Sequence, residues 1–427
     1  MPQLTDDCFA HGGPMMTTAE ALARIGDIAA AVTDSETVPL AAAAGRILAA
    51  DVTAEGQVPP HDNSAVDGYA VYFDDLHSDG ETRLPVTGRI TAGHPLDRPA
   101  RRGEALRIFT GAAMPPGDDG DGPEGRPDTI MMQEDCREDG GDVIIMPGIK
   151  RGSNRRSAGE DIAAGSTILT RGRRLKPADV GLAASAGRAT LDVYKPLRAA
   201  VFSTGDELRE PGDDLVPGAI YDANRYALSA LLDALGCAVT DLGILPDDLA
   251  TVRDALGAAA ANHDVLFTSG GVSVGDEDHV KAAVEAQGSL HFWRLAIKPG
   301  RPLALGQIAQ VPFVGLPGNP AAAMVTFMRF ARPLVLRLAG ATEVEPVLYR
   351  VRADFDHKKK LDRREWVRAR LAPLAGGGLA AVKFSREGAG ILSSLVDSDG
   401  LVELPEDMTE LAKGTMVDFL PFNEVSG

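Results

Sequence analysis

DVLFTSGGVSVG, at residues 264–275, is a short apolar run that ends in a glycine-rich turn. Apolar residues have helical spacing before this stretch, over residues 249–262, and after it, over residues 277–286. Strand, turn and helix alternate in the same way from residue 196 to residue 340. This alternation with short connections predicts a doubly wound, largely parallel sheet with helices on its faces.

Two helices of this α/β module have recognisable ends. Asn224 is expected to cap a helix that Gly236 terminates. Pro320 is expected to open a long apolar helix that reaches Leu338, because proline is favoured in the first helical turn. The other apolar runs predict strands at residues 199–203, 237–245, 290–297, 302–305 and 312–316.

Three further units flank the α/β module. An amphipathic pattern at residues 18–32 and an alanine-rich run at residues 40–48 predict helices in an elongated N-terminal linker subdomain. Short apolar runs separated by Gly, Pro and Asp predict a small β-rich subdomain and a C-terminal β domain, either a barrel or a sandwich. The fold class is therefore multidomain α/β plus β. The expected domains are 18–58 with 148–195, 59–147, 196–340 and 345–427.

One segment interrupts the β-rich subdomain. Residues 115–128, PPGDDGDGPEGRPD, are acidic and rich in glycine and proline. Such a composition predicts a surface loop, and we expect no function for it.

Composition and charge exclude several classes of protein. The 427 residues include 43 Lys and Arg against 61 Asp and Glu, a net charge of −18, which argues against binding to nucleic acid or to an anionic membrane. Three widely spaced cysteines favour a reducing cytoplasm. The longest charge-free stretch, residues 311–328, is broken by prolines, and residues 1–18 do not resemble a signal peptide. We therefore expect a soluble cytoplasmic protein.

Glycine-rich turns follow three of the predicted strands. Ligands bind beyond the carboxyl ends of parallel strands, and glycine lets the backbone approach a bound anion. One such turn is explained equally well as a tight connection, whereas three at one sheet edge favour a binding site. The expected substrate-binding residues in these turns are Ser203, Thr204, Gly205, Ser269, Gly270, Gly271, Ser273, Pro317, Gly318, Asn319 and Pro320.

Carboxylates also gather at this sheet edge, at Glu207, at Asp247 after the strand at residues 237–245, and at Asp278. Acidic residues beside anion-binding turns would repel a phosphate unless a hard cation lay between them, as Mg²⁺ does when carboxylates and substrate phosphate share it. We expect Glu207 and Asp278 to hold Mg²⁺, while helix capping is an equal alternative for Asp247. Lys298 and Arg301, in AIKPGRP, would supply positive charge for an oxyanion, unless they belong to a solvated loop.

Two polar segments lie outside the α/β module. Residues 59–70, PPHDNSAVDGYA, contain Asp62 and carry more polar groups than a turn requires. Residues 155–161 mix both charge signs and end at Asp161. Either segment alone is explained by a solvated loop. The eight histidines show no HExxH spacing, which argues against a zinc hydrolase.

Taken together and in this order, the motifs resemble those of the MoeA-type molybdopterin molybdenumtransferases, a family related to the gephyrin E domain. The resemblance extends over residues 18–422. The motifs are HDNSAVDGYAV, AGEDIAAG, VFSTGDEL, IYDANRY, LPDD, SGGVSVGDEDHVK, FWRLAIKPGRP and LPGNPAAA. One departure is Arg294, which stands where the family commonly has lysine.

The resemblance implies an elongated homodimer of four-subdomain chains. Its α/β domain would be MogA-like and bind the pterin. Family members insert molybdate into adenylated molybdopterin and release AMP, with Mg²⁺ as the usual ion. The implied catalytic residues are Asp62, Asp161, Glu207, Asp247, Asp278 and Lys298, with Asp62 supplied by the partner chain.

Two other functions are compatible with the motifs. The α/β module alone would look similar in a molybdopterin adenylyltransferase, although the flanking segments argue against this. The protein could also be a non-catalytic binding scaffold, since the gephyrin relative also clusters membrane receptors, but a scaffold would not need the acidic set. The upstream adenylyltransferase is a further candidate partner.

Overall fold

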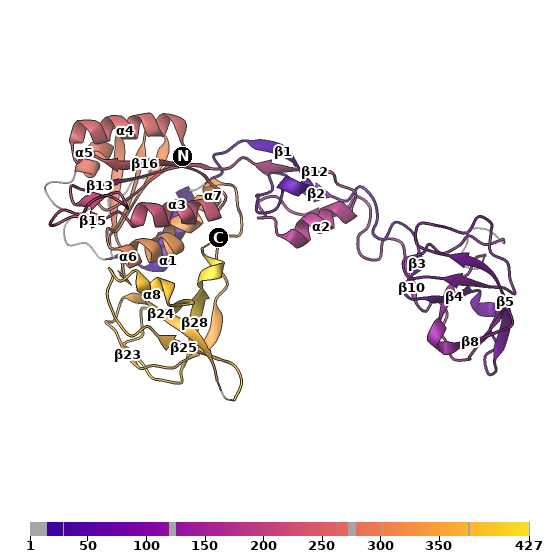
Figure 1. The fold of residues 1–427 in the computed structure, drawn as a ribbon. Helices are drawn as coiled ribbons and strands as arrows, with labels where there is room; N and C mark the ends of the chain where they lie inside the picture. The colour runs from indigo at the N-terminus through magenta and orange to yellow at the C-terminus, as the bar shows by residue number, and fades with distance from the viewer. Residues whose placement is uncertain are drawn as a thin grey trace.

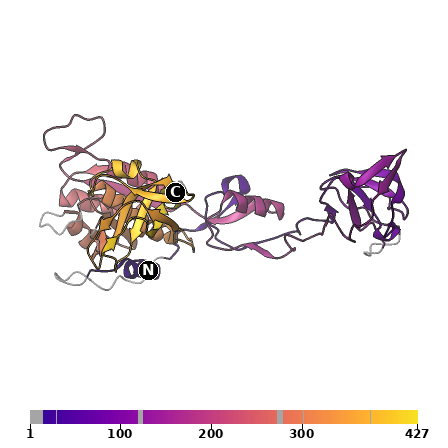
Figure 2. The same ribbon diagram turned by 90° about the horizontal axis from the view of Figure 1, so that it is seen from below.

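The protein is elongated, with three bodies arranged along its length (Figure 1, Figure 2). This computed structural model describes residues 15–28, 30–118, 125–271, 279–300, 302–374 and 376–426. The α/β domain and the C-terminal domain lie together at one end, a narrow linker follows, and a β-rich subdomain forms the other end (Figure 1). Among the described residues, no helix is long and apolar enough to cross a membrane.

A six-stranded sheet forms the centre of the α/β domain, with the order β16-β13-β17-β21-β20-β18. The first four strands run parallel to one another, β20 pairs antiparallel with β21, and β18 at the edge pairs antiparallel with β20. The predicted largely parallel sheet is therefore confirmed. The strands are β13 (Arg198–Thr204), β16 (Ala238–Leu245), β17 (Val265–Ser269), β18 (Gly288–Arg294), β20 (Pro302–Ile308) and β21 (Val311–Leu316).

Helices cover both faces of this sheet, as the alternation of side chains along β13 requires. Ala199 and Val201 belong to the core beneath α3, whereas Ala200 and Phe202 belong to the core beneath α4 and α5. The helices are α3 (Asn224–Ala234), α4 (Leu249–Asn262), α5 (His279–Glu285), α6 (Pro320–Thr326) and α7 (Arg332–Leu338). A π-helical segment, η4 (Phe327–Ala331), joins α6 to α7, so the long helix predicted from Pro320 to Leu338 is continuous.

Three predicted elements differ from the structure. Helix α1 (Thr18–Ile28) is shorter than expected and packs on α7, where Ala21 and Ile25 are buried in the α/β core rather than in the linker. The alanine-rich run forms a single 3₁₀ turn, η1 (Leu40–Ala42), because Gly45 adopts a φ of +81°, outside the right-handed helical region. The strand expected at residues 290–297 is divided between β18 and a separate strand, β19 (Ile297–Lys298).

The linker contains two antiparallel strand pairs and one helix. The chain passes through it twice, because β1 pairs with β12 and β2 pairs with β11. Pro177 lies at the first turn of the helix, and Asp179 accepts a hydrogen bond from the amide of Lys176. The elements are β1 (Ser35–Pro39), β2 (Val52–Thr53), β11 (Thr167–Leu169), β12 (Thr190–Tyr194) and α2 (Pro177–Ser185).

The outer β-rich subdomain has a six-stranded sheet of order β7-β4-β6-β5-β9-β8. A short pair, β3 (Asn63–Ser64) with β10 (Arg155–Arg156), lies where the linker enters it. The strands are β4 (Gly68–Val71), β5 (Thr82–Ile90), β6 (Ala105–Ile108), β7 (Thr129–Met132), β8 (Cys136–Asp139) and β9 (Asp142–Ile145), and the 3₁₀ turns are η2 (Phe73–Asp75) and η3 (Gln133–Asp135).

The C-terminal domain is a closed five-stranded barrel, one of the two expected alternatives. Closure follows from the order β24-β25-β22-β28-β26 with an additional pairing of β26 to β24. Strand β19 of the α/β domain extends the barrel by pairing with β24. The elements are β22 (Tyr349–Ala353), β23 (His357–Lys358), β24 (Arg364–Pro373), β25 (Leu379–Lys383), α8 (Ser393–Val396), β26 (Gly400–Leu404), β27 (Glu410–Leu411), β28 (Met416–Pro421) and η5 (Phe422–Glu424).

Candidate functional site

Strands β13, β17 and β21 are neighbours in the sheet, so the turns that follow them leave at one edge. Phe202 is paired with Thr268, and Ser269 is paired with Leu316, which brings the three carboxyl ends into register. We call the turns after these strands (residues 203–207, 269–271 and 317–320) the rim. Ser273, Asp278 and Arg301, which were also expected here, lie outside the described residues.

The three rim turns are in close contact. A Cβ atom added to Gly271 would lie 2.6 Å from Thr204 Oγ1, and one added to Gly318 would lie 3.6 Å from the Cα of Gly270. Gly270 and Gly271 also have φ values of +85° and +63°, a conformation that residues with side chains rarely adopt. Glycine is therefore required at this junction by both backbone conformation and space.

Polar groups line the rim, and several are buried. Ser269 Oγ donates a hydrogen bond to the carbonyl oxygen of Pro317 at 2.9 Å. Ser203 Oγ and Thr268 Oγ1, near the carboxyl ends of β13 and β17, are buried without a hydrogen-bond partner in the part of the chain that the structure describes. Because buried polar groups are normally satisfied, these two unpaired hydroxyls are unusual features of the strand ends beside the rim.

The acidic residues at the rim and after the neighbouring strand β16 differ in their surroundings. Glu207 folds back over the preceding turn, so that a Cβ atom on Gly205 would lie 2.5 Å from its Oε2. Asp248 caps α4 by accepting the amide of Thr251 at 2.8 Å, and the hydrogen bonds from Thr251 lower the pKa of this carboxyl group. Asp247 is exposed and makes no hydrogen bond or ion pair within the described ranges. Asp248, and not Asp247, therefore caps helix α4.

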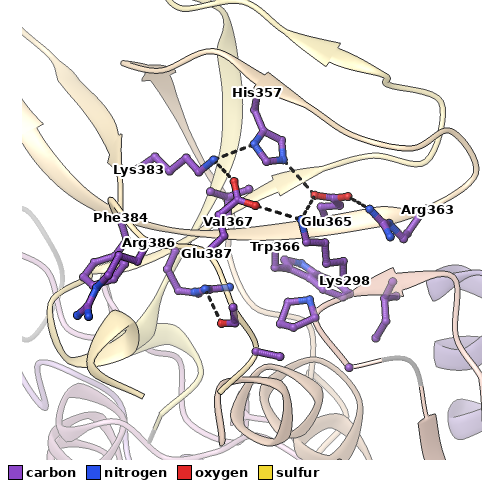
Figure 3. Close-up of a pocket in the computed structure, with 16 residues that line it drawn as sticks. Lys298, His357, Arg363, Glu365, Trp366, Val367, Lys383, Phe384, Arg386 and Glu387 are labelled. Carbon is purple, nitrogen blue, oxygen red and sulfur yellow. Dashed lines mark hydrogen bonds and ion pairs between the residues drawn. The ribbon is translucent and has the colours of Figure 1, made fainter. Parts of the chain in front are cut away.

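Lys298 lies in a cleft of about 220 Å³ between the α/β domain and the barrel (Figure 3). Its Nζ is 3.5 Å from the carboxylate of Glu365 and 3.6 Å from that of Glu387. Five Lys and Arg side chains and two carboxylates line this cleft, which we call the basic cleft, so positive charge predominates. The charged lining residues are Lys298, Arg363, Arg368, Lys383, Arg386, Glu365 and Glu387.

Glu365 organises the floor of the basic cleft. It is 1% exposed, contacts Arg363, and accepts a hydrogen bond from His357 Nε2 at 3.0 Å, while Lys383 Nζ lies 3.1 Å from His357 Nδ1 (Figure 3). Burial alone would raise the pKa of Glu365, but the hydrogen bonds from His357 and Arg363 and the charge of Lys298 outweigh it and lower this pKa to about 2.

The rim and the basic cleft adjoin each other at the start of α6. The amide of Ala321 donates to the carbonyl oxygen of Ala389, a residue that lines the cleft, at 2.9 Å. Gly300, also in the lining, packs on α6, where an added Cβ atom would lie 2.4 Å from Thr326 Oγ1. The Pro317–Pro320 turn therefore connects the two parts of one candidate site.

The barrel contributes residues to this site that were not predicted from the sequence. His357, Glu365, Lys383 and Glu387 come from β23, β24, β25 and the loop after β25. The one available signal was the density of basic residues in DHKKKLDRREWVRAR, residues 356–370. A basic run is usually a solvated face, so that signal could not indicate which side chains turn inward.

Asp62 and Asp161 lie in a different part of the molecule. They flank the β3–β10 pair, at the end of the molecule opposite the rim (Figure 1). Asp62 accepts the amide of Ala158 at 2.8 Å and pairs with Arg126 at 2.7 Å and Arg155 at 3.7 Å. One chain therefore does not bring Asp62 and Asp161 to the rim.

The acidic insertion has a role that its composition did not indicate. Arg126, within residues 115–128, forms the shortest ion pair of Asp62, and the carbonyl oxygen of Gly125 accepts a hydrogen bond from Tyr72. Asp128 is buried and accepts the amide of Phe73 at 2.9 Å. The last residues of this segment therefore belong to the folded subdomain and contact a predicted site residue.

Comparisons with known proteins agree with the motifs. Sequence models match for the MoeA N-terminal region (domain I and II) at residues 16–187, a probable molybdopterin binding domain at residues 200–337, and the MoeA C-terminal region (domain IV) at residues 350–422.

Curated relatives and solved structures match over nearly the whole chain. A molybdopterin molybdenumtransferase of Haemophilus influenzae is 36% identical over 97% of this chain and 100% of its own, and one of Nostoc is 35% identical over 89% and 87%. Crystal structures of a molybdopterin biosynthesis MoeA protein from Pyrococcus horikoshii match with TM-scores of 0.73 at 30% identity and 0.80 at 27%, each over 96% of this chain. They cover 99% and 100% of those chains. This chain belongs to the MoeA family of molybdopterin molybdenumtransferases.

Proposed function

We propose that the protein inserts molybdate into adenylated molybdopterin and releases AMP. The observation that carries this proposal is the continuity of the rim with the basic cleft. A glycine-lined rim suits a phosphate ester, and an adjoining cleft with surplus positive charge suits a small oxyanion.

The pterin nucleotide would bind at the rim. Gly205, Gly271 and Gly318 allow backbone groups to approach its phosphates, and the hydroxyls of Ser203 and Thr268 remain available for hydrogen bonds. Asn319 and Pro320 begin α6 beside the cleft. Such a placement would bring the bound pterin next to the oxyanion in the cleft.

Molybdate would bind in the basic cleft next to Lys298. The Lys298 ammonium group is held between two carboxylates but remains partly exposed, so it can contact a ligand. A positive charge that is held in place by two carboxylates is preorganised to stabilise an oxyanion.

Mg²⁺ would be held by Glu207 and Asp278 together with substrate phosphate. Among the described residues no three acidic, histidine or cysteine side chains cluster as a metal site, and Asp278 lies outside them. Glu207 at the rim fits a magnesium site that protein carboxylates complete only in part, as is usual for this ion. The ion would neutralise phosphate charge, and Asp247 would orient the attacking oxygen.

A homodimer would complete the site. Asp62 and Asp161 lie too far along the molecule to serve the rim of their own chain, so the partner chain would supply them. The upstream adenylyltransferase would deliver the substrate in the cytoplasm.

The proposal is tested with purified protein, adenylated molybdopterin, molybdate and Mg²⁺. We expect AMP release that is lost in Glu207→Ala. Consumption of ATP with metal-free pterin would indicate an adenylyltransferase instead. Unchanged molybdoenzyme activity in cells that carry Glu207→Ala would indicate a scaffold.

A further inference from the structure

The first two residues of α3 connect the strand ends that surround the rim. Asn224 and Arg225 belong to the motif IYDANRY, and Asn224 was expected to cap a helix. The N-cap of α3 is instead Ala223, and Asn224 is already helical. The side chains of both residues bind the turns after β17 and β21, the segment after β13, and strand β16.

Asn224 joins the turns after β17 and β21. Its Nδ2 donates to Ser269 Oγ at 2.8 Å and to the carbonyl oxygen of Gly318 at 2.7 Å. Ser269 in turn donates to Pro317 O, so the amide closes a small hydrogen-bonded network between two rim turns. Only a side chain with two N–H donors on one atom can make both contacts.

Arg225 joins the segment after β13 to strand β16 itself, because its partner Asp241 lies within that strand. Its side chain is 3% exposed and contacts Asp222 at 3.0 Å, both carboxylate oxygens of Glu210 at 2.6 Å, and Asp241. Glu210 and Asp222 lie at the two ends of a projecting arm, residues 210–222. Tyr226 supports the same pairing by donating to Glu210 at 2.9 Å.

The arm is continuous with Glu207. Strand β14 (Leu208–Arg209) pairs with β15 (Ile220–Tyr221), and the amide of Ile220 donates to the carbonyl oxygen of Glu207 at 2.8 Å. Whatever fixes the two ends of the arm therefore fixes the backbone that carries the Glu207 carboxylate. A buried guanidinium group shared by three carboxylates is a rigid support of this kind, because each partner would be left uncompensated without it.

We propose that Asn224 and Arg225 are positioning residues of the proposed reaction, Asn224 for the two turns that would hold the pterin nucleotide and Arg225 for the arm that carries Glu207. This inference rests on the proposed function. Neither residue needs to contact substrate, because each acts through the loops that it holds.

Two variants test the two halves separately. Asn224→Asp keeps the shape of the side chain and suits a helix start, but it removes both donors. Arg225→Lys keeps the charge but cannot bind three carboxylates at once. Asn262→Asp, the same chemical change at an exposed position of α4, is the control. Thermal unfolding is measured for all three variants to confirm that they fold.

Hydrogen exchange gives a readout that does not depend on activity. In Asn224→Asp we expect exchange of the amides at 269–271 and 318–319 to accelerate by about tenfold, with the arm unchanged. In Arg225→Lys we expect faster exchange of the amides in the arm, with those at 269–271 and 318–319 unchanged. In the Asn262→Asp control we expect both groups of amides to exchange as in the wild type. If either variant should fail to fold, Glu210→Gln, which alters a half-exposed partner of Arg225, replaces Arg225→Lys, and Ser269→Ala replaces Asn224→Asp.

Steady-state kinetics then separate the roles. Asn224→Asp should raise the KM for the adenylated pterin by about tenfold, whereas Arg225→Lys should lower kcat with little change in KM. Equal exchange in the wild type and the variants, or acceleration over the whole domain in both, would overturn the inference. Absence of AMP release in the wild type would refute the proposed function, while the exchange pattern would still decide whether these residues position the rim.

Discussion

Replacing Glu365 by Gln tests the electrostatics of the basic cleft. The pKa of Glu365 is about 2 in the folded protein against a usual value of 4.5. Because the folded-state pKa is depressed, the ionised carboxylate stabilises the fold fully above pH 4.5, and this stabilisation is lost as the pH falls toward 2. A shift of this size corresponds to about 3 kcal/mol, since one pKa unit is worth about 1.4 kcal/mol.

The assay is urea unfolding of wild type and Glu365→Gln, followed by the fluorescence of Trp366, which is buried beside the substitution. We expect Glu365→Gln to be less stable by about 3 kcal/mol at pH 7, and the difference to shrink to about 1 kcal/mol near pH 3. Glu410→Gln is the matched control, because Glu410 belongs to the same barrel but is exposed. If the difference in unfolding free energy between wild type and Glu365→Gln is the same at pH 7 and pH 3, the ionised Glu365 carboxylate does not stabilise the fold.

Three further predictions concern the rim, the cleft and the dimer. Gly271→Ala should lower AMP release at least about tenfold, because the added Cβ atom would meet Thr204. Gly236→Ala is the control, because Gly236 also has a positive φ but has open space around it, and it should only slightly change the melting temperature. Lys298→Ala should raise the KM for molybdate about tenfold in the same assay, and an unchanged KM would remove this lysine from the oxyanion site. Mixed Asp62→Ala and Glu207→Ala chains should recover about a quarter of wild-type AMP release, and no recovery after verified subunit exchange would contradict a shared site.

The central sheet was predictable because its information is local. Each strand is a short apolar run, each helix has its own spacing, and glycine marks the turns between them. The meeting of the three rim turns followed from the parallel order of β13, β17 and β21. By contrast, β20 pairs antiparallel with both β21 and β18, and apolar runs alone do not distinguish the two directions.

The parts that could not be predicted depend on long-range contacts. Pairing of β19 with β24 brings Lys298 to Glu365 across 66 intervening residues, and no local pattern encodes that pairing. Asn224 looked like a helix cap because asparagine is favoured there, whereas its amide instead joins two distant turns. Arg126 lies in a segment of loop composition, so its ion pair with Asp62 was visible only in the structure.

The most direct test of the central claim is a crystal structure of the protein with adenylated molybdopterin and tungstate, a heavier analogue of molybdate. We predict that the nucleotide phosphates bind against Gly205, Gly271 and Gly318 and that tungstate binds beside Lys298 in the basic cleft. A nucleotide bound away from these three glycines, or tungstate bound outside the cleft, would contradict it.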